Sequence, residues 1–232
     1  MKKSFFLAGA LIVALSTAAS AATFSVIGGT AGNIPEAGQT NEVLINVFGT
    51  TSAAGYFGSQ VSLDMDADIE VAFFGYEAGF FNTFEITGTG GTETFSSTVG
   101  VTKKYAQNAA TPISTATISA TAGLLNFRFT SNGIVNGSPV ADAVNGSNPD
   151  NIPNGASNFF TSFARGDKGT VFLFFDDTGA GDDDNHDDFV VRLSVNAGGD
   201  QDPSPVPLPA GGILLLGGLG ALAVTRRRKT KS

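Results

Sequence analysis

Short apolar segments separated by turn residues fill the chain between Ala22 and Val195. Their spacing is typical of β-strands, and no part of this region shows a convincing helical period. Val, Ile, Phe and Thr dominate, whereas the Leu, Lys, Glu and Gln that cover helix surfaces are sparse. The pattern predicts an all-β fold, a β-sandwich with a jelly-roll-like pair of sheets. The expected strands are Phe24–Ile27, Val43–Phe48, Gln60–Asp64, Ile69–Phe74, Phe80–Ile86, Glu93–Val99, Thr115–Ala120, Leu124–Thr130, Phe159–Phe163, Thr170–Phe175 and Phe189–Val195.

The last two expected strands flank an acidic loop. Thr170–Phe175 is apolar on both faces, as a central strand would be. The loop, Asp176–Asp188, holds seven carboxylates in thirteen residues. Calcium takes oxygen ligands, and Gly179 and Gly181 allow the backbone to turn its carbonyls inward. The sequence therefore predicts a calcium site formed by Asp176, Asp177, Asp182, Asp183, Asp184, Asn185, Asp187 and Asp188.

The alternative for this loop is a solvated acidic turn that keeps a hairpin edge soluble. Zinc is not expected, because the chain has one histidine and no cysteine. The same lone histidine, His186, would have to serve any Ser-His-Asp triad, and no G-x-S-x-G motif supplies a nucleophile. We therefore expect no catalytic residues and no enzyme activity, with an envelope hydrolase as a remote alternative.

Three further polar features leave alternatives open. Asp64–Val71 alternates charged and apolar residues, which fits a solvated strand face or a turn at Ala67. Glu77 and Asn82 are either paired ligands or side chains that bond the backbone of a turn. Ser131–Asn158 contains four Asn-Gly pairs, which indicate one or two small hairpins or an exposed insertion.

The N-terminus has the pattern of a secretory signal peptide, residues 1–21. Lys2 and Lys3 precede an apolar run from Phe5 to Leu15, and Ala19 and Ala21 form an A-x-A cleavage site. The mature chain should begin at Ala22. A body domain of residues 22–200 follows, then a linker of residues 201–205. The body is long enough for one domain with a sizeable core.

Residues 206–232 combine a proline-rich motif, an apolar run and a basic end. The run Gly211–Val224 is shorter than the roughly 20 residues of a full membrane span, and clustered cations after it stay on the cytoplasmic side. The motif is Val206, Pro207, Leu208, Pro209 and Ala210, and the basic tail includes Arg226, Arg227, Arg228 and Lys229.

This tail resembles the PEP-CTERM sorting signals of exported bacterial proteins, in their VPLPA variant. The resemblance implies an exosortase-type membrane protease as a partner, with cleavage near the motif and delivery to the cell envelope, the cell surface or its exopolysaccharide. A transmembrane helix that is never cleaved is the alternative. The segments Glu77–Phe84 and Asp183–Asp188 also resemble patterns of body domains that carry such tails.

The body is strongly acidic once both ends are set aside. It keeps six cations against all twenty-one carboxylates, a formal charge of -15, whereas the whole chain has -8. Phosphate backbones repel such a surface, so no nucleic-acid partner is expected. Without cysteine, disulfides and thiol chemistry are excluded.

The expected function is that of a non-enzymatic, exported surface or extracellular-matrix protein associated with exopolysaccharide or biofilm. The alternative is a calcium-dependent adhesin or carbohydrate-binding module. Stacking of a sugar would have to use phenylalanines or the three tyrosines Tyr56, Tyr76 and Tyr105, because the chain has no tryptophan.

Overall fold

The computed structural model describes residues 21–36, 38–135, 137–152, 156–180 and 184–195. Residues 1–20 of the expected signal peptide, residues 196–200 of the expected body, the linker and the whole sorting tail lie outside the described residues. The expected all-β body is confirmed. The elements are β1 Phe24–Ile27, β2 Thr30–Ile34, α1 Glu42–Phe48, β3 Ala53–Phe57, β4 Gln60–Leu63, β5 Ala67–Glu77, β6 Asn82–Gly88, β7 Gly91–Ser96, β8 Lys103–Tyr105, β9 Ser114–Ala120, β10 Gly123–Leu124, β11 Asn126–Ser131, β12 Ile134–Val135, β13 Ser138–Pro139, β14 Ala143–Val144, β15 Asn158–Ala164, β16 Asp167–Asp176 and β17 Phe189–Ser194.

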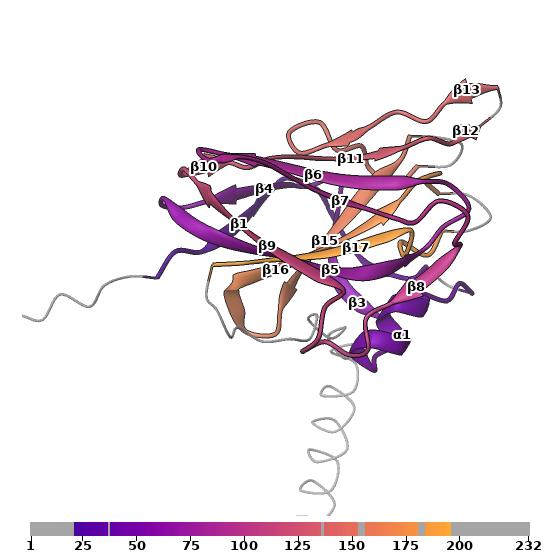
Figure 1. Cartoon of the computed structure of the whole chain (residues 1–232), viewed down its shortest axis with the longest axis horizontal. Helices are drawn as coiled ribbons and strands as arrows, with labels where there is room; N and C mark the ends of the chain where they lie inside the picture. The colour runs from indigo at the N-terminus through magenta and orange to yellow at the C-terminus, as the bar shows by residue number, and fades with distance from the viewer. Residues whose placement is uncertain (1–20, 37, 136, 153–155, 181–183, 196–232) are drawn as a thin grey trace, which may run out of the picture.

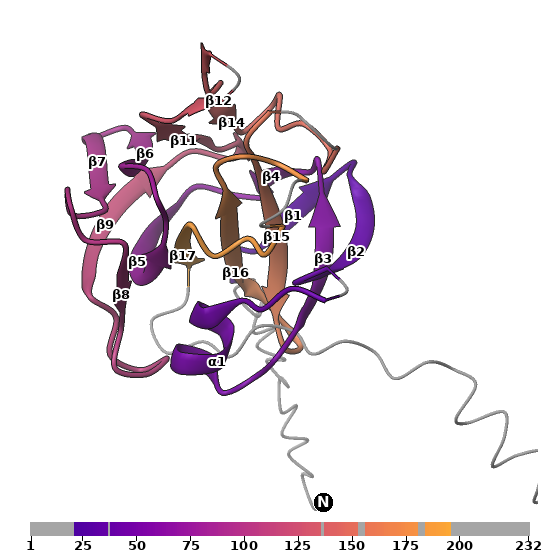
Figure 2. The same ribbon diagram turned by 90° about the vertical axis from the view of Figure 1, so that its right-hand side faces the viewer.

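The strands form a large sheet and smaller sheets that pack against it. The large sheet has the order β2-β3-β15-β16-β17-β5-β8, with β9 also paired to β5. A second sheet has the order β14-β11-β6-β7, and a third the order β1-β4-β10. Figures 1 and 2 show β6, β7 and β11 on one side of the large sheet and α1 on the other. All pairings among the described strands are antiparallel.

The central strands bury both faces, as the sequence of Thr170–Phe175 predicts. Leu173 and Phe175 point into the core between the sheets, where they meet Phe129 of β11. Phe172 and Phe174 point into a second core on the α1 side. Alternation along one strand therefore supplies two cores at once, because successive side chains leave opposite faces of a sheet.

The strand expected at Val43–Phe48 is wrong, since this segment is helix α1. Asn41 caps its N-terminus by accepting from the Leu44 amide at 2.7 Å, and Gly49 closes it in the left-handed conformation with φ 66°. Four apolar residues fall on one helical face and are buried, namely Val43, Leu44, Val47 and Phe48. The two caps and this second core outweigh the β preference of the valines.

The structure decides between the alternatives for two polar segments, Asp64–Val71 and Ser131–Asn158. Asp64 to Asp66 lie between β4 and β5, and Ala67 already begins β5, so the expected turn at Ala67 is wrong. Asp68 is exposed beside the buried Ile69, which fits the alternative of a solvated strand face. Asp64 accepts from the backbone amide of Thr23 at 2.7 Å. The polar stretch contains the small hairpin of β12 and β13, and β14 pairs with β11. Among the described residues, no helix is long and apolar enough to cross a membrane.

Candidate functional site

The described carboxylates of the acidic loop lie inside the protein. The exposed fractions of its described carboxylates are 0% for Asp176, 3% for Asp177, 6% for Asp184, 0% for Asp187 and 6% for Asp188. The reading of this loop as a solvated turn is therefore wrong. Buried carboxylates have to be paired, hydrogen-bonded or bound to a cation, because leaving water costs a charge several kcal/mol.

Asp176 ends β16 and has two different oxygens. Its Oδ1 accepts from the backbone amides of Thr178 at 2.8 Å and Gly179 at 2.7 Å, which fixes the carboxylate in a tight turn. Gly179 has φ 69°, and a Cβ there would lie 2.7 Å from the Ala156 carbonyl oxygen, so this position needs glycine. The Oδ2 of Asp176 is buried and has no hydrogen-bond partner among the described residues.

His186 faces that free oxygen from the residues just before β17. It is fully buried, and it is the one non-glycine residue with positive φ, 58°, in the described part of the chain. Such a conformation in a bulky residue persists only where the surroundings enforce it. The backbone carbonyl of His186 accepts from the side-chain amide of Asn41 at 3.0 Å, which helps to hold it.

A chain of amides orients the imidazole ring. The Nε2 of His186 lies 2.8 Å from Oδ1 of Asn158, whose amide nitrogen donates to Asn151 Oδ1 at 3.1 Å. The amide nitrogen of Asn151 in turn donates to both oxygens of Asp184, at 2.9 and 3.0 Å. This order of donors makes Nε2 the nitrogen that donates to Asn158, so Nδ1 is the nitrogen on the side of the carboxylates.

The Nδ1 atom is turned towards two carboxylates. It lies 3.5 Å from Asp184 Oδ1 and 3.8 Å from Asp176 Oδ2, longer than an ordinary hydrogen bond of about 2.9 Å. The atom has no hydrogen-bond partner in the described part of the chain. A buried polar atom left without a hydrogen bond costs about 1–3 kcal/mol, so the arrangement favours a bound proton or cation.

The pKa values of the two carboxylates are shifted in opposite directions. Burial raises the pKa of Asp176 to about 6, although the nearby His186 ring opposes the shift. Burial also acts to raise the pKa of Asp184, but the imidazole and the Asn151 amide outweigh it and hold this pKa below its usual value. Asp184 is therefore the firmer anion of the pair.

The remaining loop carboxylates form separate contacts. Asp177 accepts from the Asn82 amide at 2.7 Å, and the backbone amide of Asp177 donates to Asp188 at 2.8 Å. Burial, followed by the charges of Asp177 and Asp176, raises the pKa of Asp188 well above its usual value. Asn82 thus bonds loop side chains, while its expected companion Glu77 forms an ion pair with Lys103.

Asp187 and Asn185 shape the loop itself. Asp187 accepts from the Glu42 amide at 2.5 Å, at the start of α1, and the Asn185 side chain accepts from the Asp187 amide at 3.2 Å. Of the predicted ligands, the structure thus brings Asp176 and Asp184 together and places Asp177, Asn185, Asp187 and Asp188 in other contacts. Asp182 and Asp183 lie outside the described residues.

The sequence interpretation missed His186 as a ligand, because it weighed this residue only as a catalytic base. Together with Asp176 and Asp184 it offers three ligand atoms within 4.8 Å of one another, all buried. Its position inside a run of aspartates, as the lone histidine, was the signal available in the sequence. Nothing in the sequence pointed to Asn151, which lies in the polar stretch before β15, or to Asn158, which begins β15.

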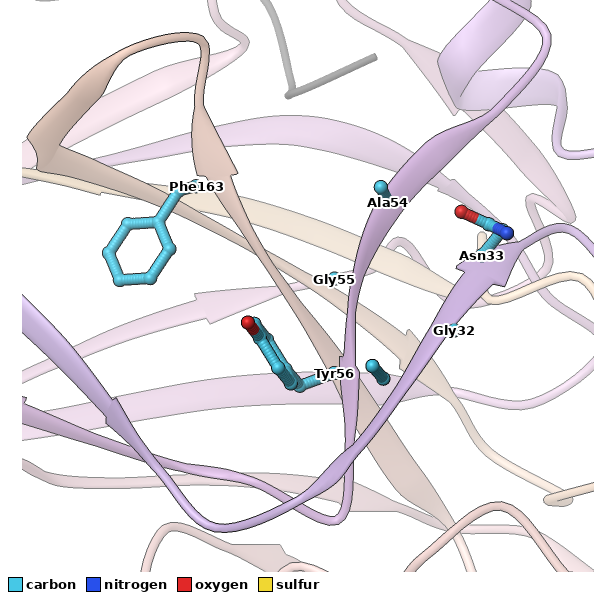
Figure 3. A pocket seen from close by; sticks show the side chains of 7 residues that line it. Gly32, Asn33, Ala54, Gly55, Tyr56 and Phe163 are labelled. Carbon is cyan, nitrogen blue, oxygen red and sulfur yellow. The ribbon is translucent and has the colours of Figure 1, made fainter. Parts of the chain in front are cut away.

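A second candidate site is an open hollow on the surface of β2, β3 and β15. Its volume is about 440 Å³, and it is lined by Ala31, Gly32, Asn33, Ala54, Gly55, Tyr56 and Phe163. Figure 3 shows the rings of Tyr56 and Phe163 on one side of β3 and the Asn33 side chain on the other. A Cβ at Gly55 would collide with the Thr161 carbonyl, so the floor of the hollow carries no side chain there.

The three tyrosines differ in access to solvent. Tyr76 is fully buried, and the Tyr105 hydroxyl donates to Glu42 at 2.5 Å. Tyr56 is 38% exposed and lines the hollow. Only Tyr56, of the three, therefore presents its ring to a ligand on this face.

Comparison with known protein families and with curated proteins finds no match. Among solved structures, the C-terminal domain of BC2L-C lectin from Burkholderia cenocepacia matches with a TM-score of 0.35 and 15% identity, over 59% of this chain and 99% of that domain. A TM-score this low supports no conclusion about ligand or function.

Proposed function

We propose that the protein is a non-enzymatic, exported surface or extracellular-matrix protein whose β body binds polysaccharide in the hollow of β2, β3 and β15. The observation that carries this proposal is the pairing of two accessible aromatic rings with a polar side chain over a floor of backbone. Apolar walls with a few placed polar groups are typical of small-ligand sites.

The chemistry of the hollow suits a sugar. The faces of pyranose rings carry C–H groups that pack on aromatic rings, and Tyr56 and Phe163 supply two such rings. The amide of Asn33 donates and accepts, as hydroxyl recognition requires. The hollow is open, which fits a segment of a long chain. An acidic body would select neutral or cation-bridged polysaccharide over a strongly anionic one.

The burial of His186 supports the non-enzymatic part of the proposal. Its ring is fully enclosed and its Nε2 is engaged by Asn158. A general base has to come within hydrogen-bond reach of its substrate, and this imidazole is enclosed by Phe57 and Phe160.

The two ends of the chain carry the part of the proposal that concerns export and sorting. Export through the signal peptide and recognition of the tail by an exosortase-type protease would place the body at the cell envelope, where exopolysaccharide is available as a partner. The inner membrane would hold the chain as an intermediate until the tail is processed.

Binding of purified exopolysaccharide and of a glycan array tests the function. We expect binding by the wild-type chain and at least tenfold weaker binding for Tyr56→Ala and for Phe163→Ala, a change of about 1.4 kcal/mol. Ile134→Ala, which truncates a side chain that is 64% exposed on β12, is the matched control. Equal binding by all four chains would overturn the assignment of the hollow, and no binding by the wild type would overturn the function.

A further inference from the structure

We infer that Asp176, Asp184 and His186 bind one divalent transition-metal ion, of which zinc is the probe, inside the body. The metal site shares no lining residue with the hollow of β2, β3 and β15, so either site can fail without the other. The inference also differs from the calcium site that the sequence predicts, because one of its three ligands is a nitrogen.

The ligand atoms have the required proximity. Ligands of a tetrahedral zinc ion with bonds of about 2.0–2.1 Å lie roughly 3.3–3.5 Å apart. The separations from His186 Nδ1 are 3.5 and 3.8 Å. The three atoms lie within 4.8 Å of one another, so the two carboxylate oxygens must approach each other by up to about 1.4 Å. Rotation about χ2 of aspartate, a soft torsion, permits this movement.

Two buried polar atoms of the site have no hydrogen-bond partner among the described residues. This distinguishes the site from a cluster of acidic residues on a surface, where water would bond such atoms. The two atoms are the Nδ1 of His186 and the Oδ2 of Asp176. Both residues are fully buried. A cation between these atoms would satisfy both at once, and three protein ligands of this kind complete their coordination with water.

The donor set decides which ion fits. Imidazole suits zinc, iron, nickel and copper, whereas calcium takes oxygen ligands. The Asn158 side chain engages Nε2 of His186 and leaves Nδ1 available to an ion, and the amide of Asn151 holds the Asp184 carboxylate. Hydrogen bonds to the far atoms of the ligands are the usual support of metal sites. The rings of Phe57 and Phe160, 5.3 and 6.2 Å from the imidazole, exclude water on that side.

Such an ion would link the end of β16 to loop residues that lie outside the sheet. Asp176 ends β16, whereas Asp184 and His186 lie before β17. The ion would therefore close the long β16–β17 connection, and it would also hold the segment of Asn151 and Asn158 through the amide chain.

The test uses the untagged full-length chain, because a histidine tag would bind metal. As His186 is the only histidine, the imidazole nitrogen resonances come from a single residue. We expect one zinc ion per chain by elemental analysis, a higher melting temperature with zinc than with chelator, and a zinc-induced shift of the Nδ1 resonance with Nε2 still protonated. We also expect millimolar calcium to leave the imidazole spectrum unchanged.

Two variants keep the fold and remove ligands. His186→Asn retains a residue type that tolerates positive φ, and Asp184→Asn retains an oxygen for the Asn151 amide. Both should weaken zinc binding at least a hundredfold, while Asp142→Asn, an exposed carboxylate, should bind as the wild type does. If a variant fails to fold, the response of the wild-type imidazole spectrum to zinc tests the metal site without any variant. A spectrum insensitive to zinc overturns the inference, as does calcium raising the melting temperature while zinc does not.

Discussion

The side-chain amide of Asn41 donates to the backbone carbonyl of His186 at 3.0 Å, across 145 positions of the chain. The same nitrogen donates to the carbonyl of Asn185 at 2.8 Å, and the side-chain oxygen caps α1 through the amide of Leu44. One buried residue therefore starts the helix and holds the acidic loop in its left-handed turn.

Replacing Asn41 by alanine should destabilise the body by about 2–4 kcal/mol. Loss of a helix cap costs about 1 kcal/mol, and each buried carbonyl deprived of its donor adds about 1–3 kcal/mol. Urea denaturation measures the difference. Asn46→Ala is the control, because Asn46 bonds the Glu42 carbonyl at an exposed position and should change stability by less than about 0.5 kcal/mol. Equal effects of the two variants would contradict the role of Asn41.

Replacing Phe129 by alanine should cost about 3–5 kcal/mol, the usual range for a large buried aromatic. Its ring stacks on Phe175 of the large sheet with centroids 4.8 Å apart and an interplanar angle of 6°. The contact joins the two sheets. Thermal or urea unfolding measures the loss, and Val99→Ala, at a side chain 80% exposed, should remain within about 0.5 kcal/mol of the wild type. A similarly small loss for Phe129→Ala would mean that the sheets do not depend on this contact.

Replacing Tyr105 by phenylalanine should destabilise the protein most near neutral pH. The hydroxyl of Tyr105 and the ammonium of Lys103 hold the pKa of Glu42 below its usual 4.5, against the effect of burial. A carboxyl group whose pKa is lower in the folded than in the unfolded protein stabilises the fold at pH values above its unfolded pKa. That stabilisation is lost as the pH falls through the folded-state pKa.

The deficit of Tyr105→Phe should therefore shrink as the pH is lowered from 7 to 3. Urea denaturation across this range measures it, with Tyr56→Phe at an exposed ring as the control. A deficit of constant size at all pH values would show that the lost hydroxyl acts through packing and not through the charge of Glu42.

The native exported protein should begin at Ala22 and end near the motif of residues 206–210. The A-x-A site and the tail motivate this prediction, and intact-mass measurement of extracellular material checks it. If the extracellular protein has a mass that still includes Arg226, the sorting hypothesis is contradicted. The same mass in the inner membrane would favour a permanent anchor.

Strands with strong local patterns could be predicted, whereas those without them could not. Thr170–Phe175 and Phe189–Val195 were found because unbroken or alternating apolar residues identify a strand wherever it packs. The strands β2 and β3 were missed, since Thr30–Ile34 and Ala53–Phe57 are rich in alanine and glycine. These strands form because neighbouring strands pair with them, and such pairing cannot be recognised from the residues of the segment itself.

Local order and charge were determined by the sequence itself: the β-rich body, the acidic hairpin and the segregation of cations to the chain ends all follow from residue type and spacing. Tertiary structure alone decided that the described carboxylates of the hairpin loop are buried, that the start of α1 contacts the loop and that Asn41, Asn151 and Asn158 hold His186. The reason is physical. Burial and hydrogen-bond partnership depend on residues 28 to 145 positions apart meeting in space, and a charged loop has the same composition whether it is solvated or enclosed.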